Sequence, residues 1–251
     1  MTLWRLEWLR LTRTKRWVAL AGIYVFFGFV GPLTARYLNE IISRVGGDLE
    51  GAVIEFPDPQ PVDGLTQYAT NVSQLGLLVA VVVAAAAVTL DSTPEMGVFI
   101  RTRVQRMTDV LRPRVVVASG AVAAAYITGA LIAWYESAVL IGPLSATAVL
   151  AGIAYGALYL VFVVTVVAAV AGKARTVLTT VLVALVVLLV FPIAGVIDEI
   201  GRWLPSYLVG ALAGIPSGIP ASEYLVSAAV TLVSGGLLFW LAARWAAALE
   251  V

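Results

Sequence analysis

The chain has 251 residues, of which 61% are hydrophobic and only 12% are charged. Soluble domains carry about 25% charged residues, so half that value, together with apolar runs of about 20 residues, indicates an integral membrane protein. The absence of cysteine and histidine excludes disulfides, thiolate nucleophiles, Cys/His metal or haem sites and imidazole acid–base chemistry. A net charge of +1 favours neither nucleic acid nor an acidic partner.

The N-terminal segment 1–16 carries five cations and one acid. Trp4, Trp8 and Leu11 follow i, i+4, i+7 spacing, which places them on one helical face. A basic helix with tryptophans suits a membrane surface, so we expect an interfacial elbow helix here; a simple basic flank that orients the first span is the alternative. The apolar segment 17–35 exceeds the roughly 7–15 residues of a signal-peptide core and predicts the first transmembrane helix.

Segment 36–64 differs from its neighbours, because it holds six acids against two arginines and the turn-forming run FPDPQPVDG. We expect an external loop there, with residues 37–43 as a possible helical extension of the first span. A second external region, 198–221, contains three prolines, and its stretch 207–215 is apolar enough to fold back toward the membrane. Apolar length predicts the other five spans at 67–90, 115–135, 146–171, 177–197 and 225–243. The expected fold is an all-α integral membrane protein with six transmembrane helices.

The distribution of cations sets the expected topology. Across six alternating spans, 13 of the 16 Lys and Arg residues fall on the side that holds both termini. Positive residues accumulate on the cytoplasmic side of membrane proteins, so we expect cytoplasmic N- and C-termini.

The predicted spans hold essentially no ionisable residues, although ion-coupled transporters and intramembrane enzymes usually need them as relays or ligands. The sole Gly–Lys pair, Gly172–Lys173, lacks the upstream glycine of a phosphate-binding loop, so we do not expect this chain to bind ATP. Gly152 and Gly156 form a GxxxG pair, which predicts close approach of helices, either within the chain or between two chains.

A charged segment, 91–114, lies between two long apolar runs and reads DSTPEMGVFIRTRVQRMTDVLRPR. It contains five arginines: Arg101, Arg103, Arg106, Arg112 and Arg114. Each would cost about 2.5–3.5 kcal/mol at the centre of a bilayer, so we expect a water-exposed loop on the basic side. Pro94 and the nearby acids favour a short helix that begins near residues 92–95. The arginines can pair with carboxylates of a soluble partner, or they can simply enforce topology and contact lipid headgroups.

Within this segment, Glu95-Met96-Gly97 followed by Thr102-Arg103-Val104-Gln105-Arg106 resembles the E-x-G … T-P-[small/apolar]-S-R signature of ABC-2-type permeases, the membrane subunits of ABC transporters. Arg103 stands where that family often has proline, and Gln105 where it often has serine. The basic N-terminal helix, the six spans and the external Trp203-Leu204-Pro205 are also similar to that family's layout.

The resemblance implies a single permease domain over 1–251, with a cytoplasmic coupling helix in the 91–114 loop that docks onto a separate ATP-binding subunit. The residues that it assigns to this coupling are Glu95, Gly97, Arg101, Arg103 and Arg106. It further implies two permease copies, identical or different, and two ATP-binding subunits that carry the ATP and Mg²⁺, with no cofactor and no enzymatic activity in this chain.

The expected role is export of a hydrophobic or amphipathic compound across a bacterial plasma membrane. A non-transport membrane scaffold or immunity protein that recruits a soluble partner remains the alternative, because it needs the same docking loop.

Overall fold

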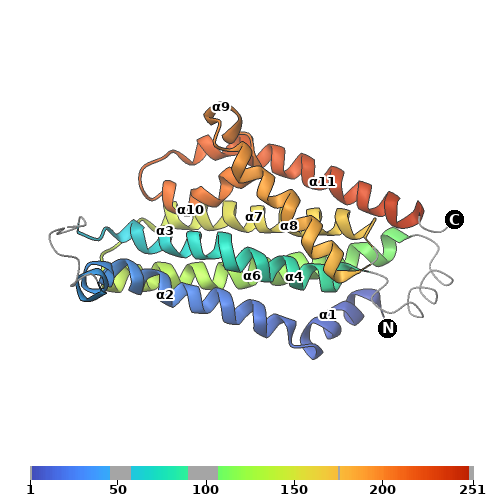
Figure 1. Ribbon diagram of the computed structural model, residues 1–251, viewed down its shortest axis with the longest axis horizontal. Coiled ribbons are helices and arrows are strands. Elements are labelled where there is room, and N and C mark those ends of the chain that lie inside the picture. Colours follow the sequence, from blue (N-terminus) through green and yellow to red (C-terminus); the bar gives the residue numbers. More distant parts are fainter. Residues whose placement is uncertain (1, 46–57, 90–106, 175, 249–251) are drawn as a thin grey trace.

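The computed structural model describes all residues except 1, 46–57, 90–106, 175 and 249–251. The described part is helical and contains no strand. Its long helices run roughly along one axis, with the N- and C-termini at the same end (Figure 1). In chain order the α-helices are α1 (Leu3–Arg13), α2 (Arg16–Val45), α3 (Pro61–Asn71), α4 (Leu77–Val88), α6 (Met107–Leu140), α7 (Ala146–Ala171), α8 (Val177–Ala194), α9 (Asp198–Gly201), α10 (Ala211–Gly214) and α11 (Leu225–Ala248). A π-helical segment, η1 (Val72–Gly76), joins α3 to α4, and two 3₁₀ segments, η2 (Pro205–Gly210) and η3 (Ala221–Tyr224), flank α10.

Six helices of the described part are long and apolar enough to cross a membrane, which indicates a multi-pass membrane protein. They are Arg16–Leu38, Pro61–Val88, Met107–Leu140, Ala146–Ala171, Val177–Ala194 and Ala221–Ala246. The predicted number of spans is therefore confirmed, and the fourth span has the predicted bounds.

Several other helices extend beyond their predicted ends, whereas the second and fifth spans end earlier than predicted, at Val88 and Ala194. α2 continues to Val45, so the suggested helical extension over 37–43 is confirmed and the predicted loop 36–64 is too long. At its other end, the predicted loop stops at Pro61, which is the first residue of α3. The backbone N–H of Gln60, just before this helix, donates to Asp63 Oδ2 at 2.7 Å. Both features are typical helix starts. Apolar length locates the part of a helix that suits lipid, whereas backbone hydrogen bonding continues into polar sequence.

Three buried tyrosines join the first, second and third spans. The Tyr24 hydroxyl donates to the Gly76 carbonyl at 3.1 Å, and the Tyr68 hydroxyl donates to the Tyr126 carbonyl at 2.9 Å. Gly76 closes the π-helical segment η1, where the regular backbone pattern is interrupted. Since buried hydroxyls need partners in an apolar interior, these bonds fix how α2, α3 and α6 lie against one another.

Helix α7 lies at the centre of the bundle. Of the residues in its most apolar 18-residue stretch, 67% are buried, against 22% in α8. Its GxxxG pair packs inside the chain. A Cβ on Gly152 would lie 2.7 Å from Leu212 Cα, and a Cβ on Gly156 would collide with the Tyr126 hydroxyl. Leu208 and Leu212 are fully buried, and their segments η2 and α10 contact α7, so stretch 207–215 folds back onto the bundle. Of the two predicted uses of this pair, the structure shows the intrachain one.

Candidate functional site

The residues predicted to couple this chain to a partner, Glu95, Gly97, Arg101, Arg103 and Arg106, lie outside the described residues. The structure does describe the two helix ends between which they lie. α4 ends at Val88 and is followed by Thr89, and α6 begins at Met107. Both ends lie at the same end of the bundle as the two termini (Figure 1).

Two arginines predicted to belong to the water-exposed loop are instead part of α6. This helix begins at Met107, eight residues before the predicted start of the third span, and it includes Arg112 and Arg114. Arg112 is exposed, but Arg114 is only 3% exposed. The prediction of a charged loop over the whole of 91–114 is therefore wrong for its last eight residues, because a long helix can carry a buried cation when another element supplies the opposite charge.

Glu7 of α1 supplies that charge. Arg114 Nε lies 3.3 Å from Glu7 Oε1, and Arg10 Nη1 donates to the same oxygen at 3.1 Å. The Glu7 and Arg114 side chains are 8% and 3% exposed. Among the described residues Arg114 Nε has no aligned hydrogen-bond acceptor, so its contact with Glu7 is an ion pair without hydrogen-bond geometry. Either charge alone would be costly at this depth, and each therefore depends on the other.

Arginines also bind the carbonyl groups at the end of α4. Arg114 Nη1 donates to the Thr89 carbonyl at 3.4 Å, and Arg16 Nη1 donates to the Ala86 carbonyl at 2.8 Å. The last carbonyls of a helix lack intrahelical partners and carry partial negative charge, so cations there are favourable. The Thr89 hydroxyl lies 3.5 Å from the Thr180 hydroxyl of α8. We call Glu7, Arg16, Thr89 and Arg114 the charged brace.

The brace joins segments that are far apart in the sequence. α1 contributes Glu7, the start of α2 contributes Arg16, the residue after α4 is Thr89, and α6 contributes Arg114. Thr89 directly precedes the segment 90–106, which holds the predicted coupling residues, and Arg114 lies in α6, the helix that follows it. The brace therefore ties both sides of that segment to α1 and, through Thr89, to α8.

Sequence reasoning did not find Glu7, which entered only as the one acid of segment 1–16. Its i, i+4 spacing with Leu11 is the sequence feature that could have indicated its burial, because Glu7 and Leu11 are the buried residues of α1. The three residues predicted to share one helical face differ in burial: Leu11 is buried, whereas Trp4 and Trp8 are exposed. The face that α1 turns to the bundle is thus defined by an acid and a leucine.

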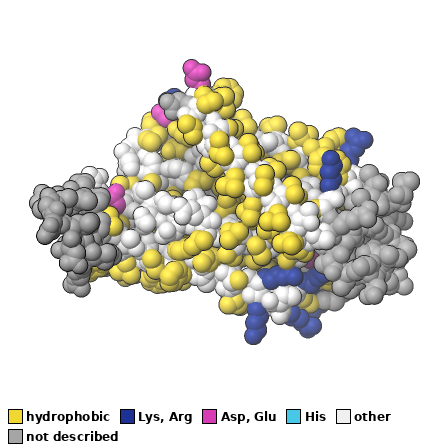
Figure 2. Space-filling model, in the orientation of Figure 1, with side chains coloured by type: hydrophobic (Ala, Val, Ile, Leu, Met, Phe, Trp, Pro, Cys, Tyr) yellow, Lys and Arg dark blue, Asp and Glu magenta, His cyan; other side chains and the backbone are white. Residues whose placement is uncertain are grey.

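Charge is segregated between the two ends of the bundle. Figure 2 shows blue side chains near the end with the termini and magenta ones toward the other end and over α9. The first group belongs to α1, to the start of α2 and α6, and to the ends of α7 and α11; we call this the basic end. Its described cations are Arg5, Arg10, Arg13, Lys15, Arg16, Arg112, Arg114, Lys173 and Arg244. At the opposite end, acids outnumber cations: the described acids there include Glu40, Asp58, Asp63, Glu136, Glu199 and Glu223, against Arg36 and Arg202, and we call it the acidic end.

Among the described residues, no group of three or more acidic, histidine or cysteine side chains could hold a metal ion. The chemistry that this site offers is ionic contact and hydrogen bonding between helices. No protein-family model, curated protein or solved structure matches the chain.

Proposed function

We propose that this chain is the permease subunit of an ATP-driven transporter of the ABC-2 type. In this proposal a separate ATP-binding subunit docks on the 91–114 loop, with Glu95, Gly97, Arg101, Arg103 and Arg106 at the contact. Two permease copies form the pathway, and the ATP and Mg²⁺ are held by the partner. The transported compound is hydrophobic or amphipathic, and the direction is export from a bacterial cell.

The observation that carries the proposal is the charged brace. A partner that moves the segment 90–106 acts first on the residues at its two borders, Thr89 and Met107. Thr89 is bound by Arg114, and Arg114 is paired with Glu7. Packed helices move as rigid elements, so displacement of this segment passes to α1 and to the spans that α4 and α6 form.

Charge segregation supports the proposed orientation. The loop that carries the E-x-G and T-R-V-Q-R residues leaves from the basic end, which by the positive-inside tendency faces the cytoplasm, where ATP is present. In the same orientation, α1 lies at the cytoplasmic membrane surface as the elbow helix. Its exposed Trp4 and Trp8 are side chains that favour the headgroup region.

The coupling role is tested by the double variant Glu95→Ala/Arg101→Ala. The expected result is loss of co-purifying ATP-binding subunit and of ATP hydrolysis stimulated by the permease, with the thermal unfolding of the spans unchanged. Arg202→Ala serves as the matched control, since Arg202 is an exposed arginine at the acidic end. Full partner binding and full ATP-dependent activity in the double variant would contradict the coupling assignment. Partner binding by the unaltered chain without any ATP-dependent movement of a compound would favour the scaffold alternative.

A further inference from the structure

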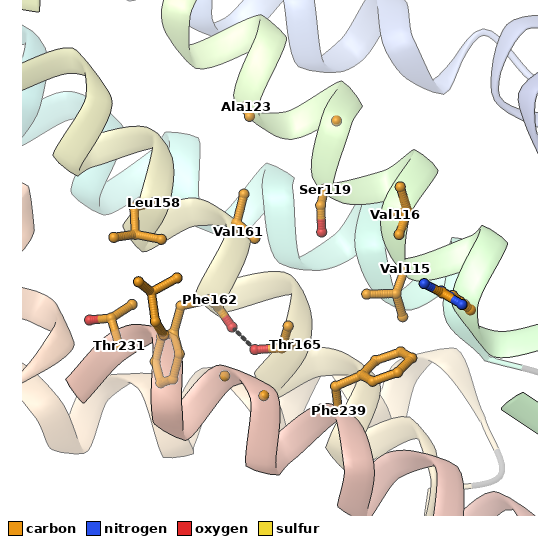
Figure 3. A pocket seen from close by; sticks show the side chains of 15 residues that line it. Val115, Val116, Ser119, Ala123, Leu158, Val161, Phe162, Thr165, Thr231 and Phe239 are labelled. Carbon is orange, nitrogen blue, oxygen red and sulfur yellow. Dashed lines mark hydrogen bonds between the residues drawn. The ribbon is translucent and has the colours of Figure 1, made fainter. Parts of the chain in front are cut away.

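A groove of about 550 Å³ lies between α6, α7 and α11 (Figure 3). Ligand-binding pockets in proteins have volumes of about 300–1,000 Å³. Its walls are apolar side chains, among them Val115, Phe162 and Phe239. Three hydroxyls also line it, those of Ser119, Thr165 and Thr231. The last two donate to the carbonyls of Phe162 and Ser227 at 2.7 and 2.6 Å. The groove therefore presents a surface suited to hydrocarbon.

Small residues make the groove hollow. Gly120 of α6 and Gly235 and Gly236 of α11 line it. A Cβ added to Gly120 or Gly236 would have no atom within 4 Å. A Cβ can therefore be added at these two positions without displacing neighbours, and larger side chains there should narrow the groove that these glycines line.

One charged side chain borders the groove. Arg112 is exposed and makes no ion pair or hydrogen bond within the described part of the chain. It lies at the basic end. From Arg112 to Ala123 the groove follows α6 for about 16 Å at 1.5 Å per residue, which is close to the depth of one leaflet, about 15 Å of hydrocarbon. A cation at headgroup level with an apolar groove one leaflet deep is complementary to an anionic lipid.

We infer that this groove binds an acyl chain of an anionic phospholipid from the leaflet at the basic end, with the headgroup phosphate beside Arg112. A helix of a second copy of this chain is the alternative occupant, and the variants described below distinguish it from a lipid. This lipid site does not depend on the proposed transport function.

A second groove, of about 470 Å³ between α7, α8 and α11, provides an internal comparison. Its cation is Lys173, whose Nζ already lies 4.3 Å from the centre of the Trp245 ring. Arg112 has no such partner among the described residues. Selectivity for anionic lipid is therefore assigned to the groove beside Arg112.

The inference is tested by titrating delipidated protein in mild detergent with phosphatidylglycerol and phosphatidylcholine of identical chains, and by counting bound lipids with native mass spectrometry. We expect one phosphatidylglycerol per chain to be retained in preference to phosphatidylcholine. In Arg112→Gln its affinity falls about fivefold, as expected for one cation near a headgroup, while phosphatidylcholine binding stays unchanged.

A second pair of variants tests the groove separately from the charge. Gly120→Leu with Gly236→Leu fills the hollow and lowers the binding of both lipids, whereas Gly22→Leu, at another exposed helical glycine with no atom within 4 Å, leaves both unchanged. Equal retention of the two lipids, or binding that is insensitive to Arg112→Gln and to the filled groove, would overturn the inference. The inference would also be overturned if the protein formed a dimer that dissociated only in the filled-groove variant, because the occupant of the groove would then be a second copy of the chain. None of these readouts involves an ATP-binding subunit, so their failure leaves the proposed function standing.

Discussion

The two ends of the bundle are held together by different interactions. At the basic end, a buried acid and two arginines join α1, α2, α4 and α6 through ionic contacts and carbonyl groups. At the acidic end, η2 and α10 pack on α7 through a glycine and buried leucines. Removing a charge should therefore destabilise the basic end, and adding volume should destabilise the acidic end.

Polar contacts at the acidic end reinforce the packing there. The Tyr155 hydroxyl donates to the Ala221 carbonyl at 3.0 Å, and the Ser227 hydroxyl donates to the Leu204 carbonyl at 2.6 Å. The Tyr207 and Tyr224 rings stack with centroids 4.9 Å apart. These contacts tie the segment between α8 and α11 to α7 and to α11 and join its own two ends, and none of them involves an ion pair.

The largest expected effect comes from breaking the brace. Glu7→Leu leaves Arg114 buried without its acid, and removal of one partner from a buried ion pair costs about 3–5 kcal/mol. The measurement is the free energy of unfolding in mixed micelles, together with trypsin cleavage between α1 and α2, which should become faster as α1 detaches.

The control for this change is the double variant Glu7→Leu/Arg114→Met. Because an apolar pair of similar volume often replaces a buried ion pair at little cost, we expect it to recover more than half of the lost stability. Arg13→Gln, at an exposed arginine of the same helix, should change stability by less than about 0.5 kcal/mol. A Glu7→Leu variant as stable as Arg13→Gln would show that the brace does not hold α1.

Gly152→Ala is the corresponding change at the acidic end. The added Cβ would lie 2.7 Å from Leu212 Cα and 2.8 Å from the Ala211 carbonyl oxygen, both of which are backbone atoms. Overpacking of this kind costs about 1–3 kcal/mol. Gly22→Ala, where the Cβ meets no atom within 4 Å, should be neutral or slightly stabilising. Equal melting temperatures for the two variants would refute the close packing of α10 on α7.

Tyr155→Phe removes one hydrogen bond from the acidic end and leaves the ring in place. We expect a loss of about 1 kcal/mol, because the Ala221 carbonyl loses its donor. Tyr135→Phe is a suitable comparison, since Tyr135 is 67% exposed and should tolerate the change. Thermal unfolding of both variants measures the difference; a larger loss for Tyr135→Phe would mean that the hydroxyl of Tyr155 is not a structural contact.

The smallest expected effect concerns the turn between α1 and α2. Lys15 has φ 54°, and it is the one non-glycine residue of the described chain with positive φ. Glycine adopts this conformation without a Cβ clash, so Lys15→Gly should raise the unfolding free energy by up to about 1 kcal/mol. Arg13→Gly, in a regular helix, should lower it by a similar amount. A destabilised Lys15→Gly variant would show that the turn does not need the left-handed conformation.

Most of the membrane spans could be predicted from the sequence, whereas the contacts of the charged brace could not. Span 146–171 was predictable to the residue because Gly142-Pro143 and the GKAR link interrupt the apolar run on both sides. The start of α6 at Met107 was not, since its first turns carry charges that hydropathy assigns to a loop.

The pairing of Glu7 with Arg114 joins positions 107 residues apart. Neither residue belongs to a local sequence motif that would predict the other as its partner. Only the packing of α1 against α6 brings them together, so this part of the site required the structure.

The central claim, that this chain is a permease driven by a separate ATPase, is tested most directly by purifying it from native membranes in mild detergent and measuring its stoichiometric partners and their ATP hydrolysis. We predict a soluble ATP-binding subunit at parity with the permease and ATPase activity in the purified complex. A clean preparation with no nucleotide-binding partner would contradict the account.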